Sequence, residues 1–190
     1  MSTTAFDDAS SVPVANLLSL KGRRAVVTGG GQGLGKAIAL RLAEAEAEVL
    51  IGDLDRERAR QAAADVGDRY SVGVLGFQMD VSDSHSVSRA AAVAVAEFGG
   101  IDIWVNNAGI FPSVPVLETP DQTWDDVFAV NARGVFNGSR EAARHMNAQG
   151  NGGSDHQHRL HRRLHWNSTG TVCLCGVQAR SPRHDQTNGP

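Results

Sequence analysis

Short apolar runs alternate with longer segments of helical periodicity along most of the chain. Runs such as Arg24–Thr28 have the length and near-continuous apolar character of buried parallel strands. Between these runs, apolar residues recur every three or four positions, as on one face of a helix. The pattern predicts strands over 24–28, 49–53, up to 80 and over 101–105, with helices over 34–45, 55–66 and from Ser82 or Asp83 to Phe98. Such alternation predicts an α/β fold, a Rossmann-type doubly wound parallel sheet.

The pattern changes at both ends of this region. Residues 1–20 hold two acids and no basic residue before Lys21, so they lack the positively charged start of a secretory signal. We interpret residues 1–20 as a flexible leader on a cytoplasmic protein. Residues 151–190 show no apolar periodicity and are expected to be a disordered tail. The domain over 21–150 is therefore predicted to be a Rossmann domain truncated at its C-terminal end. Within it, three prolines between 112 and 120 mark a loop, followed by one long or two abutting helices over 124–146.

Composition argues against several classes of partner. A net charge of −3 and a pI near 6.1 give no support for binding nucleic acid or an anionic membrane surface. The tail holds five of the seven histidines and the pair Cys173-x-Cys175, residue types that bind transition metals. These side chains have no predicted scaffold, so we expect no metal site, no nucleic-acid partner and no membrane partner.

A glycine-rich turn joins the first strand to the first helix. Glycines let backbone approach a phosphate closely, and a helix N-terminus adds partial positive charge and free N–H groups. The candidate cofactor-binding residues here are Gly29, Gly31, Gln32, Gly33, Leu34 and Gly35. Two alternatives stay open: a turn that binds nothing, and the phosphate loop of a nucleotide triphosphatase. Gly30 to Lys36 fits the second pattern, but Ala37 stands where a magnesium-binding hydroxyl is needed.

Asp53 follows the second strand, about where a dinucleotide fold places the acid that binds the adenosine ribose. A carboxylate there accepts both ribose hydroxyls and repels a 2′-phosphate. The turn residues Gly30, Gly31 and Gln32 supply no arginine for such a phosphate. We therefore expect NAD to be preferred over NADP. The alternative is a solvated turn aspartate with no ligand.

Four motifs in this order and spacing resemble the short-chain dehydrogenase/reductase family. They are the turn Thr28-Gly-x-x-x-Gly-x-Gly35, the pair Asp80-Val81, the turn Asn106-Asn107-Ala108-Gly109, and Asn131 within Val130–Gly134. The resemblance covers residues 21–150. It implies that Asp80 and Val81 contact adenine, that Asn107, Ala108 and Gly109 lie beside the cofactor, and that Asn131 belongs to the catalytic site. It also implies hydride exchange between a nicotinamide and a small alcohol or ketone, and a homotetramer.

The chain departs from the family pattern in its last forty residues. The family's catalytic tyrosine and lysine have no counterpart here, because the only tyrosine is Tyr70 and no lysine follows Lys36. We expect the chain as printed to be inactive and poorly folded. Its alternative role is that of a non-catalytic dinucleotide-binding remnant.

The genetic code offers an explanation for this departure. When residues after about 154 are read one base out of frame, positions 155–160 permit Ile-Ile-Asn-Ile-Ala-Ser, which resembles the family's fifth strand and catalytic serine. Positions 174–178 permit Tyr-Ala-Ala-Ser-Lys, which contains the family's Y-x-x-x-K motif. We therefore predict that the tail is a one-base frameshift of an ordinary family member. The alternative is that these residues are a genuine, different C-terminus of the protein.

Overall fold

The computed structural model describes residues 12–149 of the chain. It contains a parallel sheet of four strands in the order β3-β2-β1-β4. The strands are β1 Arg24–Thr28, β2 Glu48–Asp53, β3 Val74–Gln78 and β4 Ile103–Val105. The predicted α/β doubly wound fold is thus confirmed. The predictions for residues 1–11 and 150–190, including the tail and its frameshift, lie outside the described residues.

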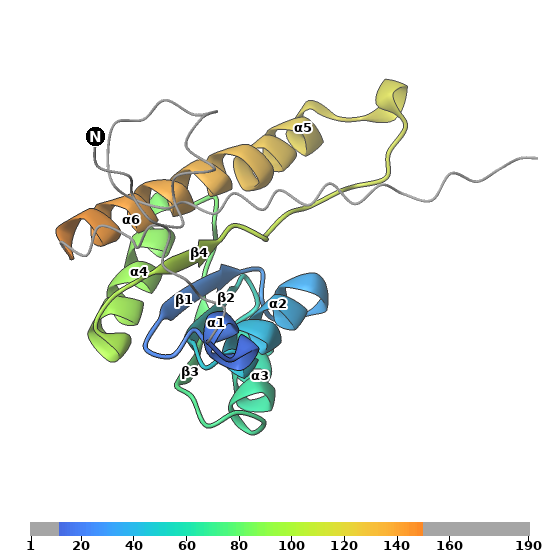
Figure 1. Ribbon diagram of the computed structural model, residues 1–190. Coiled ribbons are helices and arrows are strands. Elements are labelled where there is room, and N and C mark those ends of the chain that lie inside the picture. Colours follow the sequence, from blue (N-terminus) through green and yellow to red (C-terminus); the bar gives the residue numbers. More distant parts are fainter. Residues whose placement is uncertain (1–11, 150–190) are drawn as a thin grey trace, which may run out of the picture.

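Helices cover both faces of the sheet (Figure 1). Helices α2 (Gly33–Glu44) and α3 (Arg56–Gly67) pack on the face that carries Val27 and Ile51. On the opposite face, Val26 and Leu50 contact α4 (Ser84–Phe98) and α6 (Gly134–Ala148). Successive strand side chains point to opposite faces, so a continuous apolar run is buried on both sides. Most of the buried apolar residues of these helices are alanines, which let the helices lie close to the sheet.

Two aspartates begin the helices that follow β2 and β3. The Asp55 carboxylate accepts hydrogen bonds from the N–H groups of Glu57 and Arg58 at the start of α3. At the start of α4 the structure selects Asp83, which accepts from His85 N and Ser86 N at 2.9 and 3.2 Å. Of the two residues that the sequence offers as the cap, Ser82 and Asp83, Asp83 is therefore the one that caps α4. Each cap satisfies N–H groups that a helix start leaves free.

The sequence predicts either one long helix or two abutting helices over 124–146, and the structure has two helices joined without a break. A 3₁₀ turn, η1 (Val116–Glu118), precedes α5 (Asp121–Phe128), and α5 runs into α6 without a break in the helical backbone. The two are joined by η2 (Ala129–Arg133), a π-helical turn with a wider backbone repeat. Neither α5 nor η2 contains a buried residue, whereas α6 buries six residues, among them Ala142 and Met146.

The start of the described chain also carries structure. Val14–Leu18 forms helix α1, within the segment for which the sequence predicts a flexible leader. Leu20 packs against the alanine-rich cluster of α2 and α3, and its N–H donates to Ala45 O at 2.5 Å. Contact with the domain therefore begins before the predicted boundary at 21. Over residues 12–149, no helix has the length and apolar character that a membrane crossing requires.

Candidate functional site

Every candidate site residue lies at or just beyond the carboxyl end of a strand, or in the helix beside it. In a doubly wound sheet this is the edge where ligands bind. The strand order places β1 between β2 and β4, so the segments that follow these three strands are neighbours. The glycine turn follows β1, Asp53 ends β2, and Asn107 to Gly109 follow β4.

The glycine turn and the segment after β4 approach each other too closely for larger side chains. Gly29 has φ of +62°, and a Cβ there would lie 2.8 Å from Ala108 Cα. A Cβ on Gly35 would overlap Gly29 O and the side-chain amide of Asn107. The motif glycines at 29 and 35 are therefore required by backbone conformation and by packing.

Hydrogen bonds hold the same two segments together. The Thr28 hydroxyl donates to Val105 O at 3.3 Å and accepts from Asn107 N and Ala108 N at 3.0 Å each. The Asn107 amide nitrogen donates to Thr28 O and Gly29 O, both at 3.0 Å. Thr28 is 2% exposed, so these bonds form away from water. They fix the path of the glycine turn before any ligand arrives.

The start of α2 fits an anionic group. Among the helices that follow β1, β2 and β3 in the described chain, α2 is the one without a side-chain cap: Gln32 precedes it and makes no cap hydrogen bond. Its first N–H groups, on Gly33, Leu34 and Gly35, thus face the turn with no side-chain acceptor from Gln32. Free N–H groups and the helix dipole together favour a phosphate there. Gln32 and this first turn would hold the pyrophosphate of a dinucleotide.

Asp53 is buried at the end of β2, and it contacts the glycine turn. Its Oδ2 accepts from Gly31 N and its Oδ1 accepts from Asp55 N, both at 3.0 Å. Each carboxylate oxygen keeps a second acceptor position, so ribose hydroxyls could still donate to it. The neighbouring Asp55 is exposed, and the N–H of Arg58 holds the pKa of Asp55 below its usual value.

Asp80 and Val81 follow β3 beside the start of α4. The Asp80 carboxylate accepts from both the N–H and the hydroxyl of Ser82, at 2.9 and 2.7 Å. Val81 is buried, and a Cβ on Gly134 would lie 2.7 Å from it. The Val81 carbonyl accepts from the Asn137 amide at 3.0 Å, which ties this segment to α6.

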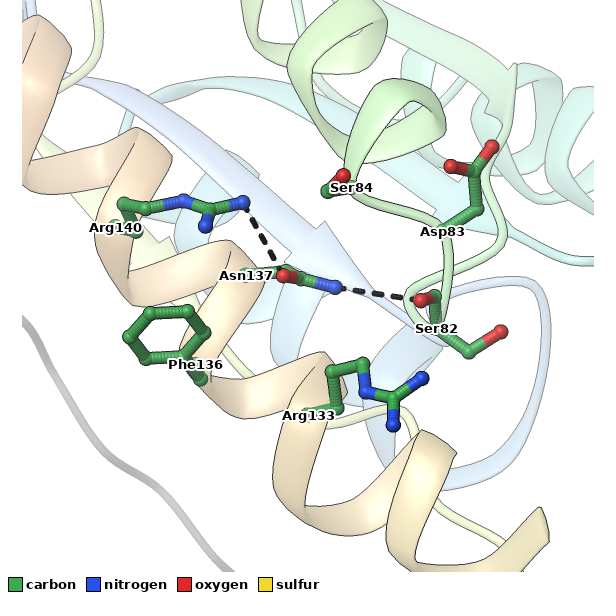
Figure 2. Close-up of a pocket in the computed structure, with 7 residues that line it drawn as sticks. All are labelled: Ser82, Asp83, Ser84, Arg133, Phe136, Asn137 and Arg140. Carbon is green, nitrogen blue, oxygen red and sulfur yellow. Dashed lines mark hydrogen bonds between the residues drawn. The ribbon is translucent and has the colours of Figure 1, made fainter. Parts of the chain in front are cut away.

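A hollow of about 440 Å³ opens next to this segment (Figure 2). It lies between the residues that start α4 and one side of η2 and α6. The Asn137 side chain lies between them, and Arg140 donates to its oxygen at 3.3 Å. The lining residues are Ser82, Asp83, Ser84, Arg133, Phe136, Asn137 and Arg140.

Asn131 lies inside the π turn η2 and pairs with the loop after β4. Its amide nitrogen donates to Ile110 O and its oxygen accepts from Ile110 N, both at 2.9 Å. A Cβ on Gly109 would lie 3.3 Å from Asn131 Oδ1. The structure therefore brings Asn131 to the turn that ends in Gly109. In this arrangement the Asn131 side chain connects the loop to the helix.

Lys36 does not lie where a phosphate-loop lysine would be needed. Its ammonium group donates to Asp65 of α3 at 2.5 Å. This hydrogen bond lowers the pKa of Asp65. The pairing turns the lysine away from the glycine turn and towards the outer helix, which disfavours the nucleotide triphosphatase alternative.

Several site residues were not identified from the sequence. Thr28 belongs to the first motif, but the sequence indicates no role for its hydroxyl, which organises the site. Asn106 is 5% exposed and accepts from Trp104 Nε1 at 3.0 Å while donating to Ser139. Arg58 reaches Asp53 from the first turn of α3. The doubled asparagine at 106–107 was a usable signal for Asn106, whereas nothing local marks Arg58.

This arrangement coincides with a match to known proteins. Residues 23–154 match the family described as short chain dehydrogenase. The chain belongs to this family. The match ends at residue 154, inside the chain, and it includes all four motifs. The family implies a nicotinamide cofactor, NAD or NADP.

Individual relatives agree with this assignment. A sorbitol dehydrogenase from Cereibacter sphaeroides is 35% identical over 136 residues, which are 72% of this chain and 52% of the relative. A 3beta-hydroxysteroid dehydrogenase 2 from Eggerthella lenta is 39% identical over 138 residues, 70% of this chain and 52% of the relative. A crystal structure of a short-chain type dehydrogenase/reductase from Mycobacterium marinum superposes with a TM-score of 0.70 at 34% identity, covering 74% of this chain and 55% of that one. The chain thus spans about half the length of the relatives it matches.

Proposed function

We propose that residues 21–150 form the NAD-binding part of an oxidoreductase that exchanges hydride between a nicotinamide and an alcohol or ketone. The bonded cluster of Thr28, Gly29, Gly35 and Asn107, beside the uncapped start of α2, carries this proposal. When bound, the nicotinamide would supply or accept the hydride. The relatives' names, which include dehydrogenases and a 5-keto-D-gluconate 5-reductase, support this reaction class.

NAD is proposed as the preferred cofactor because of Asp53. Asp53 is 7% exposed, and its carboxylate accepts hydrogen bonds from the backbone N–H groups of Gly31 and Asp55. A 2′-phosphate placed within ~4 Å of it would be repelled by a few kcal/mol at a near-surface effective dielectric. Ribose hydroxyls, in contrast, would donate to it.

A comparison of both cofactors tests this assignment. NAD and NADP are titrated calorimetrically against the wild type and Asp53→Ala. We expect NAD to bind at least about tenfold more tightly to the wild type, and the difference to shrink in the variant because the repulsion is gone. Equal affinities for the wild type would reject the role of Asp53, and no binding of either cofactor would reject the proposed function.

For the chain as printed, we propose binding without turnover. In this family a tyrosine acts as the general base, with its pKa lowered by a nearby lysine. The only tyrosine, Tyr70, lies between α3 and β3, and no lysine follows Lys36. Asn131 is proposed as a catalytic-site position, but its place in the π turn supplies no base. The non-catalytic remnant is therefore the second candidate function, and sustained NAD-dependent alcohol turnover by this chain would exclude it.

We also propose that the sequence after about 154 is a one-base frameshift. The support is the family pattern that codons 155–160 and 174–178 permit in the shifted frame. Resequencing the gene tests it directly. DNA that cannot encode tyrosine at codon 174 and lysine at codon 178 one base out of frame would reject the proposal. If it can encode both, restoring the frame near codon 153 in the full-length gene should give NAD-dependent activity.

A further inference from the structure

Arg58 lies where the glycine turn, the end of β2 and the first turn of α3 meet. A Cβ on Gly31 would lie 2.6 Å from Asp53 Oδ2 and 3.0 Å from Arg58 Cβ. Arg58 Nε pairs with Asp55 Oδ2 at 3.1 Å, and Arg58 Nη2 lies 3.8 Å from Asp53 Oδ1. A guanidinium group is therefore beside the carboxylate assigned above to the adenosine ribose.

The two partners differ in how firmly they are held. The Asp53 side chain is 9% exposed and both of its oxygens accept backbone N–H bonds, whereas the Arg58 side chain is 45% exposed. The 3.8 Å separation from Asp53 is also too long for a hydrogen bond. Asp53 is thus fixed, while the Arg58 guanidinium can turn towards a ligand without breaking a buried bond.

The position of Arg58 suits one chemical group in particular. A 2′-phosphate on the adenosine ribose would lie close to Asp53 and would be repelled by it. The planar fork of a guanidinium binds a phosphate through two N–H groups and offsets that repulsion. The glycine turn itself has no arginine for this phosphate, but α3 supplies Arg58 beside Asp53.

We propose that Arg58 is a specificity-determining residue that partly offsets the exclusion of a 2′-phosphate by Asp53. NADP is then disfavoured relative to NAD but still admitted. This inference rests on the proposed function, since it requires the adenosine ribose to bind beside Asp53. It concerns only the adenosine half of the cofactor.

Half-cofactors test this role on the full 190-residue chain. The two probes are 5′-AMP and adenosine 2′,5′-bisphosphate, titrated by calorimetry. Since charge-assisted hydrogen bonds to a partly exposed arginine are of moderate strength, Arg58→Ala should weaken the bisphosphate about five- to tenfold and leave 5′-AMP within about twofold. Arg58→Lys should keep part of the bisphosphate affinity because it keeps the charge.

Two further variants separate this effect from general damage. Arg60 lies on the same helix and pairs with Glu57 instead of Asp53, so Arg60→Ala should leave both probes unchanged. Asp53→Asn should strengthen bisphosphate binding, and adding Arg58→Ala should remove that gain.

The outcomes are distinguishable. Equal weakening of both probes by Arg58→Ala would mean a structural role and would overturn the inference, as would an unchanged bisphosphate affinity. If the wild type binds neither 5′-AMP nor NAD, the proposed function fails and this inference falls with it. If 5′-AMP binds and Arg58→Ala weakens only the bisphosphate, the result supports both the proposed function and the proposed role of Arg58.

Discussion

The glycine turn and the segment from 110 to 136 border the same site but are held in different ways. The turn is fixed by hydrogen bonds from Thr28 and Asn107, and Thr28 is buried. In the other segment, η1, α5 and η2 contain no buried residue. Several of its large apolar side chains are exposed, namely Phe111, Val116, Leu117, Trp124, Phe128 and Phe136.

This difference matches the two roles proposed above, namely cofactor binding at the glycine turn and a catalytic-site position at Asn131. The proposed cofactor-binding end is held together within the described residues, because hydrogen bonds and close contacts join the segments that follow β1, β2 and β4. The segment around Asn131 depends on one side-chain pair to Ile110 and on the packing of α6. Glu141 in α6 is 2% exposed, and its Oε2 has no hydrogen-bond partner in the part of the chain described. The glycine turn is therefore held by several buried hydrogen bonds, whereas the segment around Asn131 leads into a helix that contains a buried carboxylate oxygen without a partner in the described residues.

A methyl group in the glycine turn should give the largest effect. Gly35→Ala places a Cβ onto Gly29 O and the Asn107 amide, and such overpacking costs about 1–3 kcal/mol or forces the turn to move. We expect a lowered free energy of unfolding in urea and loss of NAD binding. The control is Gly67→Ala, where a Cβ would meet nothing nearer than 4.0 Å. Similar losses in both variants would contradict the account of the turn.

Removal of the Thr28 hydroxyl should be nearly as damaging. Thr28→Val keeps the side-chain shape but leaves the N–H groups of Asn107 and Ala108 without their acceptor, at a cost of about 1–3 kcal/mol. Thr119→Val is the matched control, because that hydroxyl makes one exposed bond to Pro115 O. Denaturant unfolding measures both. A Thr28 variant as stable as the Thr119 variant would show that the turn is not held by this hydroxyl.

Low pH should reduce the stability contributed by Asp102, which pairs with Arg24 at the amino-terminal end of β1. Burial alone would raise the pKa of Asp102, but hydrogen bonds from the Arg24 side chain and N–H outweigh it and hold the pKa below its usual value. Because the folded-state pKa is lowered, this contribution is complete above the unfolded pKa of ~3.9 and is lost as the pH falls through the folded value. We expect Asp102→Asn to lower the stability at pH 7 and to flatten its dependence on pH below about 4. If Asp102→Asn left the pH dependence of the free energy of unfolding unchanged, the pair of Asp102 with Arg24 would not contribute to stability as expected.

Asn131 allows a smaller and more local test. Asn131→Ala removes two bonds to the Ile110 backbone that are partly open to solvent, so we expect a loss of about 0.5–1.5 kcal/mol. Hydrogen exchange should speed up at Ile110 while the amides of β1 stay protected. Faster exchange throughout the sheet would mean that the two regions are not separate in stability.

The smallest change in the free energy of unfolding is expected when the exposed Leu117 is replaced. Leu117 is 97% exposed, so Leu117→Ser should change the free energy of unfolding by less than about 0.5 kcal/mol. Self-association, measured by sedimentation, should decrease because exposed apolar patches promote contacts between molecules. A large loss of stability would show that Leu117 is buried in the folded protein.

The sequence predicted the parts of the fold that depend on short-range pattern. The apolar runs of β1 and β2 and the capping role of Asp83 are local signals, and β1 has the predicted bounds. β4 begins at Ile103, later than predicted, because the Ile101 backbone pairs with the Gln149 side chain instead. No role could be assigned to Arg58 or to the Asn106 side chain, because their positions beside Asp53 and Ser139 depend on how α3 and α6 pack on the sheet. The Asn131 side chain likewise pairs with Ile110, which lies 21 residues earlier in the chain.

We propose that the glycine turn and its neighbours after β2, β3 and β4 form one nucleotide-binding site. Titration of the ¹⁵N-labelled chain with NAD, followed by amide chemical shifts, tests it most directly. We predict saturable shifts at Gly29 to Gly35, at Asp53, at Asp80 and Val81, and at Ala108, with small changes in α3 beyond its first turn. No shifts, or shifts confined to α5 and α6, would contradict the claim.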